Sequence, residues 1–118
     1  MTGFARVVTM VSAALVGLSL SFSAAAQVLT TEQYRHPKSA DDLKYNKAYL
    51  RGVADGLLSY NMSAEPRMFC PPGVLPKISF DQANNLVMRY AHQASGAADL
   101  PLGRVLLFGL RQAYPCHR

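Results

Sequence analysis

The sequence predicts a small all-α fold, a domain of three to four helices stapled by one disulfide. Two observations carry this prediction. Apolar residues recur at helical spacing in three segments after residue 39, and a capping residue, serine or aspartate, precedes each segment. No segment of useful length alternates apolar and polar residues as a strand would. A chain of 118 residues has room for one such domain and hardly for two.

The N-terminus has the pattern of a secretory signal peptide. Residues 7–22 carry no charge, Arg6 precedes them, and Ala24, Ala25 and Ala26 follow. We expect cleavage after Ala26; the alternative, a membrane anchor, is disfavoured because the apolar run is short. Removing 26 of the 118 residues leaves 92 and takes away Arg6, so the net charge falls from +5 to +4. No later run is apolar enough to span a membrane.

The first predicted helix starts at Ser39. Residues 27–38 show no period and contain Pro37, so we expect a flexible lead-in before a helical domain over 39–118. Ser39 and Asp42 resemble a capping box. The helix should end near residues 60–62, before Pro66. Its apolar stripe comprises Leu43, Asn46, Leu50, Val53, Ala54, Leu57 and Leu58.

A second face of this helix carries tyrosines and glycines. At about 100° per residue they form a stripe about 80° wide, away from the leucines. Each glycine costs the helix roughly 1 kcal/mol relative to alanine, which suggests a close approach by another backbone. Either other helices of the same chain cover this stripe, or a second copy or a partner does. We name it the Tyr/Gly face: Tyr45, Tyr49, Gly52, Gly56 and Tyr60.

Two further helices follow a connection over residues 63–78 that contains four prolines. Ser79 and Gln82 form a capping box for the second helix, which Gly96 can terminate. Asp99 is expected to cap the third helix, with Pro101 in its first turn and Pro115 at its end. The apolar stripe of the second helix comprises Ala83, Leu86, Val87, Tyr90, Ala91 and Ala94. That of the third comprises Leu102, Val105, Leu106, Gly109, Leu110 and Ala113.

Cys70 and Cys116 are the only cysteines. Export implies an oxidising compartment, where two thiols usually pair. Closing a loop with a separation of 46 residues would stabilise the fold by about 4 kcal/mol in the chain-entropy model. We therefore interpret the pair as structural, and keep a reactive thiol as the weaker alternative.

The sequence offers few parts for catalysis. His36, His92 and His117 lack the spacing of metal ligands, and no nucleophile or phosphate-loop motif occurs. The basic residues are spread along the chain, which argues against nucleic acid as a partner. We therefore predict a binding protein without catalytic activity, cofactor or metal.

Four segments in order, YLRGVADGL (49–57), FCPPGV (69–74), VMRYAH (87–92) and LRQAYPC (110–116), resemble the Rap/Tai immunity proteins. The resemblance implies a periplasmic, non-enzymatic all-α protein with a Cys70–Cys116 disulfide. It also implies neutralisation of a peptidoglycan amidase effector of a type VI secretion system. Members often form a homodimer that inserts a loop into the effector's active-site groove.

The resemblance also singles out residues. Gly52 and Asp55 match the family's helix motif, and the other matching positions are Phe69, Cys70, Pro72, Val74, Tyr114, Pro115 and Cys116. We expect loops 61–69 and 94–100 to contact the partner, with Arg67, Phe69 and Asp99 as the contact residues.

The alternative function is a periplasmic chaperone of the acid-stress type. It would expose Leu107 and Phe108 when its carboxylates become protonated.

Overall fold

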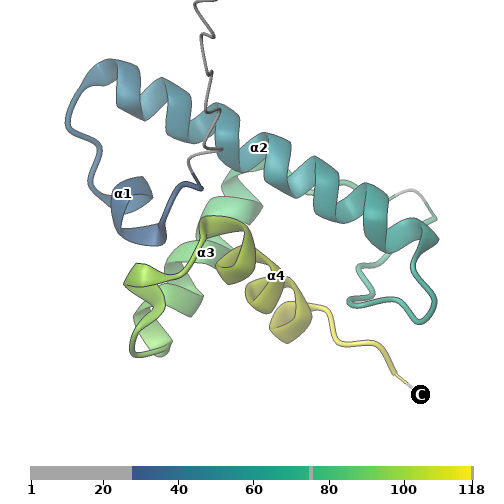
Figure 1. Cartoon of the computed structure of the whole chain (residues 1–118). Coiled ribbons are helices and arrows are strands. Elements are labelled where there is room, and N and C mark those ends of the chain that lie inside the picture. Colours follow the sequence, from purple (N-terminus) through teal and green to yellow (C-terminus); the bar gives the residue numbers. More distant parts are fainter. Residues whose placement is uncertain (1–27, 75, 118) are drawn as a thin grey trace, which may run out of the picture.

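The computed structural model describes residues 28–74 and 76–117. Over these ranges the chain forms α1 (Thr31–Arg35), α2 (Ala40–Ser63), α3 (Phe80–Gln93), a short 3-10 helix η1 (Ala97–Asp99) and α4 (Leu102–Ala113), without a strand (Figure 1). The predicted all-α fold is confirmed. None of the helices in the described ranges combines the length and apolarity needed to cross a membrane. The predicted signal peptide, residues 1–26, lies outside the described residues.

Helix α2 runs along one side of the molecule and α3 and α4 pack beneath it (Figure 1). Ser39 is its cap, as predicted, because the Ser39 hydroxyl accepts a hydrogen bond from the Asp42 amide at 3.0 Å. Leu50 and Ala54 are buried in the core. The expectation that Leu43 is a core residue is wrong: its side chain is 45% exposed. The reason is that α3 and α4 cover the middle of α2 and leave its first turns open.

The core forms chiefly between α3 and α4, which make the most extensive helix contact. Their closest approach is at Gly109, where an added Cβ would lie 3.1 Å from the Leu86 carbonyl oxygen. This site therefore requires glycine for packing. The apolar side chains with no exposed area are Leu50, Phe69, Ala83, Val87, Leu102, Val105, Leu106 and Leu110.

The two later helices begin differently. The predicted capping box of α3 is confirmed by the bonds Gln82 N to Ser79 Oγ, 3.1 Å, and Ser79 N to Gln82 Oε1, 2.9 Å. The expectation that Asp99 caps α4 is wrong, because Asp99 lies in η1 and α4 has no side-chain cap. Instead the amide of Leu102 donates to the Leu29 carbonyl at 2.8 Å, so backbone from the N-terminal segment satisfies the helix end.

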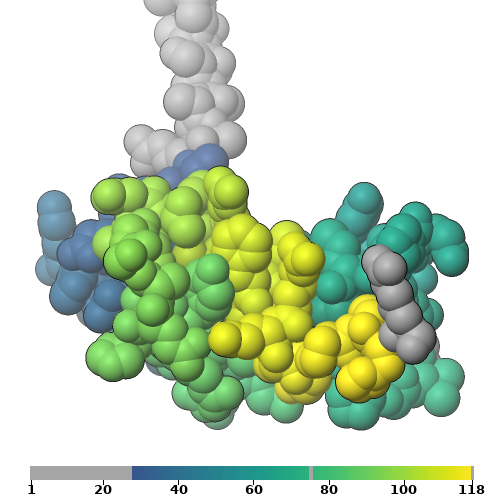
Figure 2. Space-filling view, turned by 90° about the horizontal axis from the view of Figure 1, so that it is seen from below, coloured from purple at the N-terminus to yellow at the C-terminus, as the bar shows by residue number. Residues whose placement is uncertain are grey.

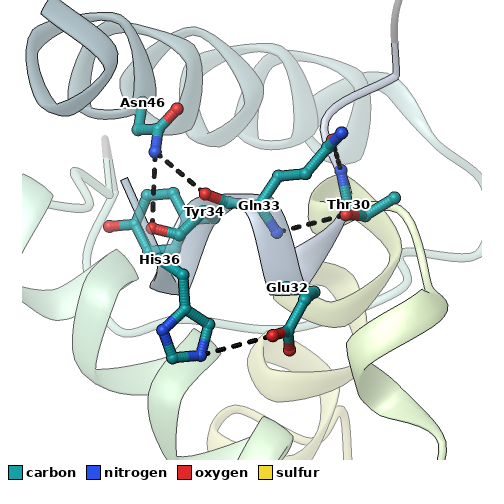
Figure 3. A network of polar contacts seen from close by, with 6 residues as sticks. All are labelled: Thr30, Glu32, Gln33, Tyr34, His36 and Asn46. Atoms are coloured by element: carbon teal, nitrogen blue, oxygen red, sulfur yellow. Dashed lines mark hydrogen bonds and ion pairs between the residues drawn. The ribbon is translucent and has the colours of Figure 1, made fainter. Parts of the chain in front are cut away.

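The predicted flexible lead-in is wrong for the residues from Leu29 to His36, which are folded onto the domain. Thr30 and Gln33 form a capping box for α1, and the Thr31 amide donates to the Leu100 carbonyl at 3.0 Å. From α2, Asn46 donates to the carbonyls of Gln33 and Tyr34 at 3.3 and 3.4 Å (Figure 3). These bonds fix α1 between the start of α2 and η1.

The glycines give a direct test of this packing. Gly109→Ala should lower the free energy of unfolding by about 1–3 kcal/mol, because its Cβ meets the Leu86 backbone. For the monomer, Gly52→Ala and Gly56→Ala should each raise it by up to about 1 kcal/mol, since within one chain a Cβ there meets nothing within 4 Å. Urea unfolding of the oxidised protein measures all three, and equal effects at Gly109 and Gly52 would contradict the packing.

Candidate functional site

The predicted disulfide is confirmed: Cys70 and Cys116 are bonded, with their Cα atoms 4.9 Å apart. It joins the proline-rich connection between α2 and α3 to the segment after α4. Next to it, the Cys70 amide donates to the Tyr114 carbonyl at 2.7 Å. The connection is therefore attached to the end of α4 by one covalent bond and one backbone hydrogen bond.

A buried asparagine holds the same connection from the other side. The Asn61 side chain accepts, through its Oδ1 oxygen, hydrogen bonds from the backbone amides of Met68 and Phe69 at 2.7 and 3.2 Å. Its amide group donates to the Phe69 carbonyl at 2.7 Å. The expectation that Phe69 contacts a partner is wrong for its side chain, which is 0% exposed and forms part of the core.

The two expected contact loops lie at opposite ends of the molecule. Loop 94–100, at the lime end of α3, lies beside α1, whereas loop 61–69, in teal, lies near the C-terminus (Figures 1 and 2). Arg67 and Asp99 are both exposed, one at each end. A single narrow groove of a partner can therefore receive only one of the two loops.

Loop 94–100 has a defined shape. Gly96 has φ +80°, a left-handed conformation that glycine adopts without strain, and it leads into η1. Ala97 is buried, and the Leu100 carbonyl accepts bonds from the amide and the hydroxyl of Thr31. Ser95, Gly96 and Asp99 remain exposed, so the loop presents a polar tip on a fixed base.

A wide hollow of about 610 Å³ lies beside the disulfide. Arg67, Arg111 and His117 line it together with Glu65. Within the described ranges the one close contact between a basic and an acidic side chain is that of His36 with Glu32, at 3.4 Å, so neither arginine is paired there. This end of the molecule therefore presents unpaired positive charge.

The Tyr/Gly face of α2 is open. Gly52 and Gly56 are exposed, a Cβ added at either would meet no atom within 4 Å, and Tyr60 is 62% exposed. The interpretation that other helices of this chain cover the face is therefore wrong for Tyr45, Gly52, Gly56 and Tyr60, whereas Tyr49 is half-buried and packs against the core. The rings of Tyr45 and Tyr49 lie 6.1 Å apart, centroid to centroid, along its first part.

The remaining motif residues divide into surface and structural positions. Asp55, Pro72 and Pro115 are exposed, and Val74 is almost fully exposed. Tyr114 is half-buried and contributes its carbonyl to the bond with Cys70.

The part of the chain that the structure describes forms no metal-binding cluster. No three of its histidine, cysteine, aspartate or glutamate side chains gather where they could hold a metal ion. His36, His92 and His117 are exposed on different segments. Burial raises the pKa of the Tyr34 phenol above its ordinary value, so this group stays protonated and donates to the Asn84 side chain at 2.6 Å.

Sequence reasoning missed the residues that position these surfaces. Asn46 and Asn61 both lie on the buried side of α2, where a polar side chain must find hydrogen-bond partners. Asn46 falls within the apolar stripe, and Asn61 lies on the extension of that stripe. A polar residue on the apolar side of a helix was the sequence signal that could have indicated a buried, hydrogen-bonding role. The Thr30–Gln33 capping box could also have been predicted from the sequence, since a threonine followed three residues later by a glutamine is the usual pattern.

These features are typical of a small helical binding protein with exposed loops and a core held by one disulfide. A family model for Rap1a immunity proteins matches residues 21–116. The chain therefore belongs to the Rap1a immunity protein family, which indicates an immunity protein of a secretion effector; such proteins typically act without catalysis. Comparisons with curated proteins and with solved structures found no significant match.

The role of Asn61 can be measured. Asn61→Ala should lower the free energy of unfolding by about 2–4 kcal/mol, because it leaves the Met68 and Phe69 backbone groups without partners. Ser63→Ala, which removes a bond from an exposed hydroxyl, is the control and should change it by less than about 0.5 kcal/mol. Similar values for the two variants would mean that Asn61 does not hold the loop.

Proposed function

We propose that this protein is a periplasmic inhibitor that binds a peptidoglycan amidase effector of a type VI secretion system. Family membership over residues 21–116 is the observation that carries the proposal. The Cys70–Cys116 disulfide supports an oxidising compartment such as the periplasm. Inhibition is steric: an exposed loop fills the active-site groove of the effector and excludes the substrate.

Loop 94–100 is the better candidate for the inserted loop. Its base is fixed by Ala97 and by the bonds between Thr31 and Leu100, so little conformational entropy is lost on binding. Both of its ends continue into α3 and α4, which pack closely at Gly109. Asp99 offers a carboxylate at the exposed part of this loop.

The test is protection from an exported amidase encoded beside this gene. Asp99→Lys and Ser95→Trp should each weaken binding at least about 30-fold, the effect of losing a central contact worth about 2 kcal/mol. Protection in co-expression should fall with binding, while the matched change at the opposite end, Arg67→Glu, should leave both unchanged.

Calorimetry of the purified pair measures the affinity, and cell lysis measures protection. If Arg67→Glu is the only one of these variants that loses protection, the contact with the effector lies in loop 61–69 instead of loop 94–100. An exported amidase that neither binds the intact protein nor is neutralised by it would contradict the proposed function.

We also propose that the Tyr/Gly face of α2 contacts a second copy of the chain. Gly52 and Gly56 occupy the middle of the face, with Tyr45 and Tyr49 on one side and Tyr60 on the other. An antiparallel pairing about a two-fold axis near residue 54 therefore places Gly52 opposite Gly56 and brings Tyr49 close to Tyr60 of the other copy. Such self-complementarity suits a symmetric dimer, and exposed tyrosines are common at interfaces.

The dimer is tested by blocking the close approach. Gly52→Leu and Gly56→Leu should convert a dimer into a monomer of unchanged helicity, because nothing in the monomer lies within 4 Å of either site. Light scattering gives the mass and circular dichroism the helicity; Asp55→Leu, beside the stripe, is the control. A protein that is already monomeric at high concentration, or a dimer unaffected by both leucines, would contradict this interface.

A further inference from the structure

A groove of about 270 Å³ lies between the end of α1, the start of α2 and the first half of α3. Leu43 and Met88 stand on its two sides, and they are 45% and 41% exposed although both are large and apolar. Phe80 adds a half-buried aromatic ring to the wall. Apolar side chains from two helices thus converge on a concave surface.

The charged side chains that line this groove are basic. Arg35 and Lys47 are among its lining residues, whereas none of the described residues that line it is acidic. The Lys47 amine lies 5.8 Å from the centre of the Phe80 ring, which keeps this charge near the apolar wall. The nearby carboxylate of Asp42 instead accepts a hydrogen bond from the Lys38 amide at 3.1 Å. The groove therefore complements an apolar group flanked by negative charge.

The groove is also preformed. Tyr34 lies at its base and donates its hydroxyl proton to the Asn84 side chain at 2.6 Å, which joins α1 to α3. Asn46 joins α1 to α2 through the carbonyls of Gln33 and Tyr34 (Figure 3). All three walls are thus connected by hydrogen bonds, and a ligand need not order them.

The position of the groove relates it to loop 94–100. In helix α1, Thr31 is hydrogen-bonded to Leu100 of the loop, and Arg35 lines the groove. These two residues are four positions apart, which corresponds to roughly 6 Å along the helix axis. Leu43 and Lys47 lie roughly opposite the Tyr/Gly face around α2 at about 100° per residue. A dimer formed through that face therefore leaves the groove open.

We propose that this groove is a second docking site for the effector, one that takes a short segment in which an apolar side chain is flanked by carboxylates. This inference rests on the proposed function. The leucine-sized side chain of the segment enters between Leu43 and Met88, and its carboxylates meet Arg35 and Lys47. Loop 94–100 blocks the active site, and the groove adds affinity and sets the orientation of the complex.

A peptide experiment tests the groove without the effector. The probe is a blocked seven-residue peptide with two leucines between glutamates, titrated into the ¹⁵N-labelled mature protein. We expect weak binding, on the order of 1 mM, with amide shifts confined to residues 34–36, 43–47 and 84–88. Binding should weaken as salt rises from about 50 to about 300 mM. A peptide with lysine for glutamate, or serine for leucine, should not bind.

Paired variants separate the groove from general charge and apolar effects. Arg35→Glu with Lys47→Glu should weaken peptide binding at least about 10-fold, whereas Arg51→Glu with Arg89→Glu, an equal charge change outside the groove, should not. Met88→Ser should weaken it several-fold, and Met62→Ser, at a similarly exposed methionine of α2, should not. Equal binding of the lysine peptide, shifts at other residues, or equal effects of the control pairs would overturn the proposal.

The same variants separate this inference from the proposed function. If Arg35→Glu with Lys47→Glu leaves affinity for a neutralised amidase unchanged, the second docking site is refuted and the immunity function stands. If no amidase is bound although the peptide binds in the groove, the immunity function against an amidase fails, and with it the assignment of the groove to that effector.

Discussion

Burial of Phe69 is the interaction on which the rest of the fold depends. The proline-rich connection between α2 and α3 can form no helix, and among its described residues Phe69 is the one large side chain that is fully buried in the core. Asn61 binds the backbone on both sides of it, and the Cys70–Cys116 disulfide joins the next residue to the end of α4. Since a domain of this size buries only a modest core, the Phe69 ring, held in place by hydrogen bonds and a disulfide, is a large part of that core.

Hydrogen bonds, the disulfide and helix packing hold both ends of the molecule in place and leave other surfaces exposed. The disulfide, Asn61 and the α3–α4 contact at Gly109 fix one end, while α1 closes the other through Asn46 and Leu100. What stays open is the length of α2 away from the core, the loop 94–100, and the groove beside Leu43. A small binding protein needs this arrangement because its contact surfaces must be exposed while their shape is already set.

The helices α2, α3 and α4 were predictable because their apolar residues follow a strict 3.6-residue period, as at Leu102, Val105, Leu106 and Leu110. The disulfide was predictable because two cysteines in a chain with a predicted export signal have one pairing. Helix α1 was not predicted, since five residues are too few to show a period and its stability comes from Asn46 and Leu100, remote in the sequence. The expectation for Asp99 failed because a remote carbonyl, that of Leu29, satisfies the Leu102 amide.

The contact surfaces were predicted less well than the fold, and Phe69 shows why. In the sequence it stands in a loop beside prolines, where an aromatic residue is equally consistent with a partner contact and with a core anchor. Only the bonds from Asn61 decide between these roles, and Asn61 lies outside the motif that drew attention to Phe69. Leu43 shows the reverse: its place in a leucine stripe predicts burial, yet α2 extends past the core there. Helical periodicity identifies the apolar side of a helix, but only the packing of its neighbours decides where that side is covered and where it remains free to bind.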